Sequence, residues 1–547
     1  MSITVFQAKK IITMNSNCPE ATHVAVREGK ILAVGHFDEM AGWLDQDEHR
    51  LDTTFAEKII LPGFVEGHAH LLAGGMWKYL YVGFHDRIDP DGKLWPGAVT
   101  IEDVLERIRQ LDSTLPAGEP LIAWGFDPIF LMDRRPDKTD FDEVSSIRPI
   151  VIMHSNFHVM TVNSPTLELA QYNVDSDVDG IAKTDNGEPN GELQEMAAMF
   201  PVMRRLGIDF RELGRTQQAV EAFGRVCNRV GVTTATDLIN DLDDEAITDL
   251  KTFTGRKDYP IRLVPMLNAL SQTAAETAKR AVELQAMSTD KLRVGGVKLL
   301  TDGSIQAFTA RLRWPGYYNG APNGIWNIAP EQLQALIDLL NQNSVAMHIH
   351  VNGDEAVEVA LDAIEFALTN HPSPDHRITL QHCQMADRSQ YRRMKKLGVC
   401  VNLFSNHIYY FGDQHAAITI GPDRAARMDG CRTALDHGIP LAVHSDAPVT
   451  PMGPLTCAWA GANRLTASGT VLGTPECISV QEALHAITLG PAYTLKMDGK
   501  VGSIEVGKWA DFAVLEDDPT NVDRQTLKDI GIWGTVLGGI IHKIPTE

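Results

Sequence analysis

The sequence predicts an α/β protein built on a (β/α)8 TIM-type barrel. Between residues 61 and 494, eight apolar, strand-like runs alternate with amphipathic stretches that have helical spacing, which is the count of such a barrel. The eight runs are residues 65–70, 232–237, 261–266, 295–302, 346–351, 378–383, 399–404 and 441–446. Several runs end in histidine, lysine or aspartate, and barrels of this kind carry their active sites at the carboxyl ends of the strands.

The two ends of the chain predict a second, smaller domain. Short β-like segments are separated by turns rich in Asn, Gly and Asp. These segments are residues 2–6, 10–14, 22–27, 30–35 and 57–61 near the start, and 502–515 and 533–542 near the end. We therefore expect residues 1–60 and 495–547 to form one composite β-sandwich domain, with the barrel domain spanning 61–494.

A large insertion is predicted after the first barrel strand. About 160 residues separate that strand from the next, far more than a βα loop contains. We assign residues 75–225 to an insertion within the barrel domain, with strands of its own at 120–126 and 149–154.

Composition narrows the classes of function. The 547 residues include 49 basic and 71 acidic side chains, and a formal charge of −22 argues against a nucleic-acid partner. No apolar run is long enough to span a membrane, and the first residues lack the pattern of a signal peptide. Seven scattered cysteines without a C-x-x-C pair predict reduced thiols in a cytoplasmic protein.

The first candidate ligands lie at the end of the first barrel strand. The run LPGFVEGHAH places His68 and His70 two residues apart, so in an extended chain both side chains project to the same side. A lone H-x-H is a weak signal, because single histidines are more often surface or core residues.

Four further strands end in possible ligands. These are Lys298, His348, His350, Asp354, His382, His444 and Asp446. Each alone has an ordinary explanation: a lysine can extend to solvent, and an aspartate before Ala-Pro can cap a turn. Their coincidence at the ends of five strands predicts a metal site, since imidazole and carboxylate are zinc ligands.

At this point the sequence resembles the amidohydrolase superfamily, and within it the amidohydrolase family 3, or YtcJ-like, branch. The resemblance covers nearly the whole chain. It rests on LPGFVEGHAH (61–70), DGS (302–304), HVNGD (350–354), HCQ (382–384), SDAPV (445–449) and ADFAVL (510–515). These motifs are specific for the family and nearly silent on the substrate.

The resemblance implies a metal site with two Zn2+ ions, although another divalent metal fits the same ligands. Its residues would be His68, His70, Lys298, His350, His382 and Asp446. Lys298 would be carbamylated and bridge the ions; burial favours a neutral amine, which can add CO2. His348 shares a strand face with His350, so the residues alone leave either as the ligand, and the motif alignment favours His350.

The function implied is hydrolysis of a C–N bond other than a peptide bond. Metal-activated hydroxide would attack the carbonyl of a small N-acyl or N-formyl amine, with Asp446 as the catalytic base. Three alternatives stay open: a mononuclear deaminase-type site without carbamylation, an ester or lactone hydrolase, and an inactive binding protein. Retention of every ligand position disfavours the last. The resemblance is compatible with a homodimer.

Four residues are candidates for substrate binding. His158 lies in a run resembling H-x-x-x-x-N-S, and Glu192 lies in GELQE, which matches the branch's G-x-L-x-E. Phe308 and Tyr409 are aromatic candidates, although aromatic side chains more often simply pack. Phe308 stands where the branch has an arginine, which predicts a less anionic and more apolar ligand.

Overall fold

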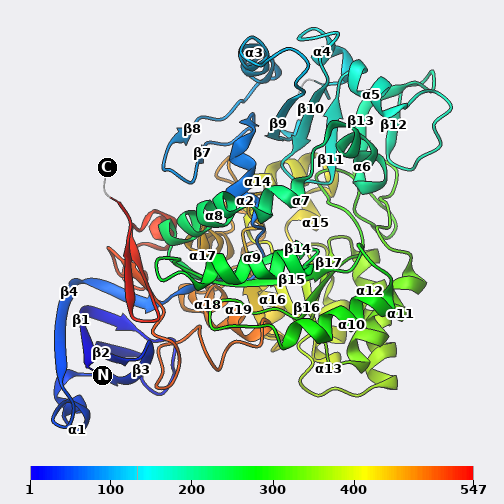
Figure 1. The fold of residues 1–547 in the computed structure, drawn as a ribbon. Helices are drawn as coiled ribbons and strands as arrows, with labels where there is room; N and C mark the ends of the chain where they lie inside the picture. The colour runs from blue at the N-terminus through cyan, green and yellow to red at the C-terminus, as the bar shows by residue number, and fades with distance from the viewer. Residues whose placement is uncertain (1, 132–133, 546–547) are drawn as a thin grey trace.

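The computed structural model describes residues 2–131 and 134–545, and its centre is a curled, eight-stranded parallel sheet (Figure 1). The eight predicted strands are all present, and neighbours in the sheet are neighbours among the barrel strands in the chain. They are β5 (Phe64–Glu66), β14 (Val232–Asn240), β15 (Arg262–Asn268), β16 (Gly296–Leu300), β17 (Met347–Val351), β18 (Thr379–His382), β19 (Cys400–Leu403) and β20 (Leu441–Val443). The predicted TIM-type barrel architecture is confirmed.

Helices follow the strands and cover the outside of the barrel. The main ones are α8 (Gln217–Arg229), α9 (Asp244–Gly255), α10 (Ala274–Gln285), α11 (Pro330–Gln342), α12 (Asp354–Asn370), α13 (Arg388–Leu397) and α17 (Pro454–Asn463). In α11 the buried apolar residues are Leu333, Leu336, Ile337 and Leu340, the spacing of one helix face turned to the core. Within the described residues, no helix is both long and apolar enough to cross a bilayer.

The barrel closes between its first and last strands, just beyond their carboxyl ends. The Asp446 N–H donates to the carbonyl oxygen of His68 at 3.1 Å, and the His70 N–H donates to that of Ala447 at 2.9 Å. His68 and His70 therefore follow β5 instead of lying within it, and their backbone is held by the segment that carries Asp446. This seam fixes the two segments against each other.

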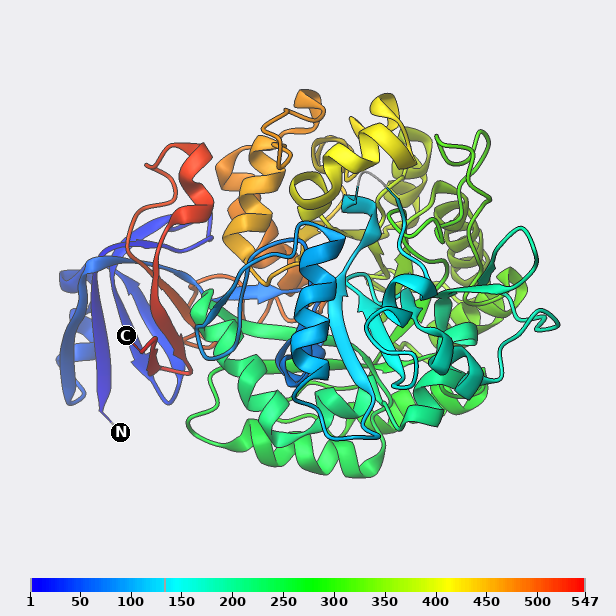
Figure 2. The same ribbon diagram turned by 90° about the horizontal axis from the view of Figure 1, so that it is seen from above.

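The insertion, which lies between β5 and β14 in the chain, forms a six-stranded sheet. The views from the side and from above show this sheet covering one end of the barrel (Figures 1 and 2). Its strands are β6 (Leu80–Tyr81), β9 (Leu121–Phe126), β10 (Ile150–His154), β11 (Val159–Val162), β12 (Ile181–Lys183) and β13 (Pro189–Gln194). Separate apolar clusters cover its two faces. The helices α3 (Ile101–Asp112) and α6 (Glu195–Leu206) contribute to these clusters.

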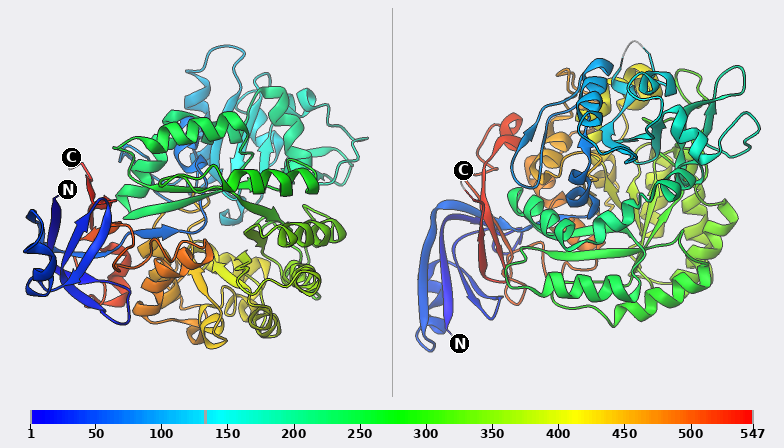
Figure 3. Two further views of the ribbon diagram at one scale, coloured as in Figure 1. Left: turned by 60° about the horizontal axis from the view of Figure 1, so that its bottom comes forward. Right: turned by 45° about the horizontal axis from the view of Figure 1, so that its top comes forward.

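Both ends of the chain meet in one seven-stranded sheet beside the barrel (Figure 3). Its order is β23-β22-β21-β4-β1-β2-β3, with β1 and β4 parallel and the other pairs antiparallel. The strands are β1 (Ile3–Ile12), β2 (Glu20–Arg27), β3 (Lys30–Gly35), β4 (His49–Pro62), β21 (Phe512–Leu515), β22 (Ile532–Leu537) and β23 (Ile540–Lys543). The division of the chain into domains stays a prediction.

Three of the predicted terminal segments differ from the structure. The segments predicted at 2–6 and 10–14 fall mostly within the single strand β1, whose pairing with β4 shifts register after Phe6 and after Ala8. Residues 533–542 are a hairpin instead of one strand. Gly538 and Gly539, both with positive φ, make its turn, a conformation that glycine adopts without a steric penalty.

A buried ion pair joins the terminal sheet to the barrel. The Arg262 guanidinium on β15 donates to Asp511 through Nε at 2.7 Å and through a terminal nitrogen at 3.0 Å. The side chains are 4% and 2% exposed, and the guanidinium also lies 4.3 Å from the Trp509 ring centroid. Asp511 is the aspartate of the ADFAVL motif, so in this chain that motif residue joins the two parts of the fold.

Replacing Asp511 by Ala is expected to lower the free energy of unfolding by about 3–5 kcal/mol, because it strands the Arg262 charge in a buried site. Chemical unfolding followed by fluorescence measures the change. The double variant Arg262→Leu with Asp511→Leu leaves no unpaired charge and should be more stable than Asp511→Ala. A single variant as stable as the parent contradicts this role.

Candidate metal centre

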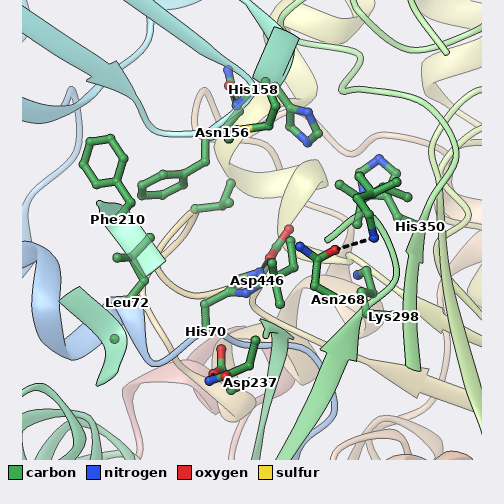
Figure 4. A pocket seen from close by; sticks show the side chains of 18 of the residues that line it. His70, Leu72, Asn156, His158, Phe210, Asp237, Asn268, Lys298, His350 and Asp446 are labelled. Atoms are coloured by element: carbon green, nitrogen blue, oxygen red, sulfur yellow. Dashed lines mark hydrogen bonds and ion pairs between the residues drawn. The ribbon is translucent and has the colours of Figure 1, made fainter. Parts of the chain in front are cut away.

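A cavity of about 330 Å3 lies between the carboxyl ends of the barrel strands and the insertion (Figure 4). Its lining includes all six residues predicted for the metal site: His68, His70, Lys298, His350, His382 and Asp446. Figure 4 shows His158 and Asn156 from the insertion on the opposite side of the cavity from His70 and Asp446. The fold thus brings together side chains that are almost 380 residues apart in the sequence.

Asp446 lies among three imidazoles. Its Oδ1 is 3.2 Å from His70 Nε2 and 3.3 Å from His68 Nε2, and its Oδ2 is 3.7 Å from His382 Nδ1. Burial by itself raises the pKa of the Asp446 carboxyl, but the facing His68 and His70 rings outweigh it and hold that pKa well below its usual range. The site therefore contains a charged carboxylate beside a group of nitrogen donors.

Lys298 points into the same group from β16. Its Nζ is 3.2 Å from His68 Nε2, and the residue is only 1% exposed. Burial lowers the pKa of the Lys298 amine to about 7, although the Asp446 charge opposes that shift. A large share of the amine is neutral near pH 7, which is the form that reacts with CO2.

The two histidines of β17 occupy different layers of the barrel. His350 lines the cavity, and its ring centroid lies 4.6 Å from that of His382. His348 lies below the cavity, where its Nδ1 is 2.6 Å from the Gln381 amide and its Nε2 is 3.3 Å from the Thr494 carbonyl oxygen. This placement favours His350 as the ligand.

A layer of hydrogen bonds beneath the cavity orients His68. The His68 Nδ1 is 2.7 Å from Gln381 Oε1, which also accepts from the Asn402 amide at 2.9 Å. With Nδ1 engaged, Nε2 is the nitrogen turned toward Lys298 and Asp446. Such outer partners fix the tautomer and the ring angle of metal-binding histidines.

His444, which directly follows β20 and is not among the six predicted ligands, packs against the site. Its ring stacks on His68 at 4.5 Å and on Phe404 at 4.9 Å between centroids. Both of its ring nitrogens are buried without a hydrogen-bond partner among the described residues. With His68 and His382 it forms a second group whose ligand atoms lie within 4.8 Å of one another.

The residues present fit a metal ion. The ligand atoms of His68, His70 and Asp446 lie within 4.8 Å of one another. His382 Nδ1 and Asp446 Oδ1 are buried and lack a hydrogen-bond partner in the described part of the chain, which is costly unless another group satisfies them. Neutral imidazoles and a carboxylate are a donor set that zinc accepts.

His158 lines the cavity from the insertion, directly before β11. Its Nδ1 lies 2.9 and 3.1 Å from the two carboxylate oxygens of Glu195, and the Glu195 N–H donates to the His158 carbonyl oxygen at 2.7 Å. Burial lowers the pKa of His158, but the Glu195 carboxylate outweighs it and the net shift is upward.

The other three substrate candidates lie outside the cavity lining. Glu192 is bound to the Arg135 guanidinium. Phe308 packs on Tyr317 with ring centroids 5.2 Å apart, within an apolar cluster beside the barrel. Tyr409 packs against the main core.

Sequence reasoning missed several residues that line the cavity. Glu195 is the last residue of the G-x-L-x-E run, so a signal existed, but the run alone does not say which carboxylate faces inward. His382, Asp446 and Glu195 all have positive φ, at 63°, 52° and 59°. Strained backbone of this kind in residues other than glycine gathers at functional sites, and it has no signature in the sequence.

A parallel barrel that carries histidines, a buried lysine and an aspartate at its strand ends defines a metal-dependent hydrolase of the TIM-barrel class. A model of the amidohydrolase family matches residues 56–541, and the chain belongs to that family. The predicted assignment is confirmed.

The chain is similar along nearly its whole length to three proteins. It is 27% identical to the putative amidohydrolase YtcJ of Bacillus subtilis over 97% of each chain. It is 23% identical to the N-substituted formamide deformylase of Arthrobacter pascens, over 97% of this chain and 96% of the relative. Among solved structures, an uncharacterized metal-dependent hydrolase from Pyrococcus horikoshii OT3 matches with a TM-score of 0.69 and 20% identity, covering 95% and 99% of the two chains.

Proposed function

We propose that the protein hydrolyses the C–N bond of a small N-acyl or N-formyl amine. The observation that carries the proposal is the Asp446 carboxylate, which faces His68, His70 and His382 beside the buried Lys298 amine in one cavity. The name of one relative, an N-substituted formamide deformylase, supports an N-formyl amine as one substrate of this kind.

The cofactor that we propose is Zn2+, with two ions per chain. His68 and His70 would hold one ion, His350 and His382 the other, and Lys298, carbamylated, would bridge them. When bound, Zn2+ lowers the pKa of water and polarises a carbonyl group.

The protein's own residues then handle the proton. Asp446 accepts a proton from the attacking water and delivers it to the leaving nitrogen as the C–N bond breaks. Gln381 keeps His68 in the orientation that the site needs. The insertion covers the barrel end and limits entry of bulk water.

A single-ion, deaminase-type site is the second candidate. The compact group His68, His70 and Asp446 is by itself a three-ligand set, which favours this alternative. Metal analysis of the purified protein separates the two candidates, because one ion per chain favours the deaminase-type site and two favour the bridged site.

Zinc-loaded protein is expected to release amine from formanilide or acetanilide, and chelation followed by zinc addition should abolish and then restore that release. Amine formation measured by chromatography tests the prediction. Phenyl acetate and a lactone serve as comparison substrates. Hydrolysis of the ester or lactone with no amine released from any amide would contradict a C–N hydrolase.

A further inference from the structure

Four methionines form one side of the cavity. Met153 comes from β10, and Met196, Met199 and Met203 come from α6, where their spacing of three and four residues places them on one helix face. We call these four residues the methionine wall. Met153, Met199 and Met203 belong to the insertion's own apolar cluster, so they pack against other side chains behind the wall.

The wall continues into aromatic and aliphatic side chains. Phe157, Phe210 and Leu72 line the cavity next to it, and all three pack against the same cluster. Methionine side chains are flexible and polarisable, so a wall of them adapts to apolar groups of varied shape. The cavity volume of about 330 Å3 lies within the range of small-molecule sites, about 300–1,000 Å3.

The imidazole of His158 stands beside this apolar surface, and Glu195 holds it through two hydrogen bonds. Glu195 accepts from His158 Nδ1 and donates its backbone N–H to the His158 carbonyl. Glu195 also packs on the barrel at Gly303, where a Cβ would come within 2.3 Å of its Oε1. The His158 ring is thus fixed at the cavity next to His350, and the centroids of the two rings are 5.3 Å apart.

The methionine wall disfavours an anionic substituent, because a carboxylate placed against apolar side chains loses its hydration without gaining a polar partner. The lining guanidinium of Arg215 lies 3.2 Å from Glu212, 3.4 Å from Asp241 and 3.1 Å from Asp243, although its Nη2 makes no hydrogen bond within the described residues. A carboxylate on the substrate that reached Arg215 would be repelled by Asp241 and Asp243, which already lie beside that guanidinium. A neutral substituent meets no such repulsion.

We propose that the insertion forms a specificity subsite for neutral amides, in which the methionine wall binds an apolar substituent and His158, positioned by Glu195, contacts the amide. The inference rests on the proposed function, since it assigns the substrate class of the same site. Phe308, the residue that the sequence predicted to favour an apolar ligand, lies outside the cavity lining.

The test measures binding of N-alkylformamides from methyl to octyl to the metal-loaded Asp446→Asn variant, which should not consume them. The dissociation constant is expected to fall about threefold to fourfold for each added CH2 until the wall is covered. The matched probes that end in a carboxylate should bind at least about tenfold more weakly. Equal affinity across the series, tighter binding of the carboxylates, or no binding of any probe overturns the proposal.

A pair of variants on one helix separates the wall from general effects. Met196 lines the cavity and Phe200 does not, yet both lie on α6 and both are 42% exposed. Met196→Gln should reduce the gain to about twofold or less per CH2, whereas Phe200→Gln should leave it unchanged. The same reduction in both variants would show that the wall is not the binding surface.

The polar contact has a different signature. His158→Phe and Glu195→Ala are expected to raise the dissociation constant by the same factor, about tenfold, for every chain length. Glu195→Gln keeps an acceptor for Nδ1 and should restore most of the affinity. If Glu195→Ala changes the gain in affinity per CH2, instead of weakening binding equally at every chain length, the positioning role of Glu195 is contradicted.

Turnover of the same series by the wild-type protein keeps the two proposals apart. Amine release without chain-length dependence leaves the proposed function standing and overturns the subsite. Chain-length-dependent binding without amine release supports the subsite and overturns the proposed function.

Discussion

Asp446→Asn is expected to lower kcat by about 10²–10⁴-fold while the metal content stays at the wild-type level. The amide is nearly the same size as the carboxylate and keeps an oxygen toward His68 and His70, so the ligand group survives. It cannot accept a proton from water at neutral pH, so the step that forms the nucleophile fails. Steady-state kinetics and elemental analysis of the same sample measure both quantities.

The control for lost charge is Asp423→Asn, an exposed carboxylate on the short helix α15 (Pro422–Ala425). It should match the wild type in both measurements. Near-normal turnover of Asp446→Asn with full metal would remove Asp446 from the proton path.

Lys298→Ala is expected to lose at least one of two metal ions and to fall below measurable turnover. The lysine is buried at the centre of the ligand group, so its loss removes the proposed bridge and leaves a gap next to His68. A small carboxylate such as acetate or propionate fits the chemistry of that gap, and adding it should restore part of the metal content. Metal analysis before and after its addition is the measurement.

Lys257→Ala, an exposed lysine, is the matched control and should keep its metal. Intact mass measured under native conditions should show added CO2 on the wild type and on Lys257→Ala but not on Lys298→Ala. Two tightly held ions in Lys298→Ala without any added carboxylate would rule out the bridge.

The barrel strands were predictable because each is a short apolar run between helical stretches, and β14 to β20 all lie within a few residues of their predicted positions. The meeting of the six predicted ligand residues in one cavity was predictable for a related reason: parallel strands place their carboxyl ends at one edge. The strand argument for His68 was only approximate, since β5 ends at Glu66 and the histidines follow it. Their common direction is set by hydrogen bonds to the segment around Asp446, which no local pattern encodes.

The residues that line the substrate part of the cavity were much less predictable. His158 lines the cavity, but Phe308 and Tyr409 pack elsewhere, because an aromatic residue gives the same sequence signal in a core and in a pocket. The choice between Glu192 and Glu195 depends on a register that only the three-dimensional sheet defines. Glu192 reaches Arg135, whereas Glu195 begins α6 with positive φ and turns toward His158.

The seam of the barrel joins the segment that carries His68 and His70 to the segment that carries Asp446. The Ser445 hydroxyl donates to Glu66 at 2.7 Å, and 379 positions separate the two residues, so this pairing requires closure of a very long loop. His68 and His70 stand on one side of the seam and Asp446 on the other, so an ion held by all three bridges the first and last strands. Ligands that bind only the native state add to its stability.

Metal supply would then affect the folding stability of the protein as well as its activity. In metal-starved cells, newly made chains would open first at this junction, where backbone amides of residues 68–70 and 444–447 lose protection from hydrogen exchange. The same opening would expose the chain to proteases before the rest of the barrel unfolds. The cellular abundance of the protein, and not only its activity, would follow the availability of its metal.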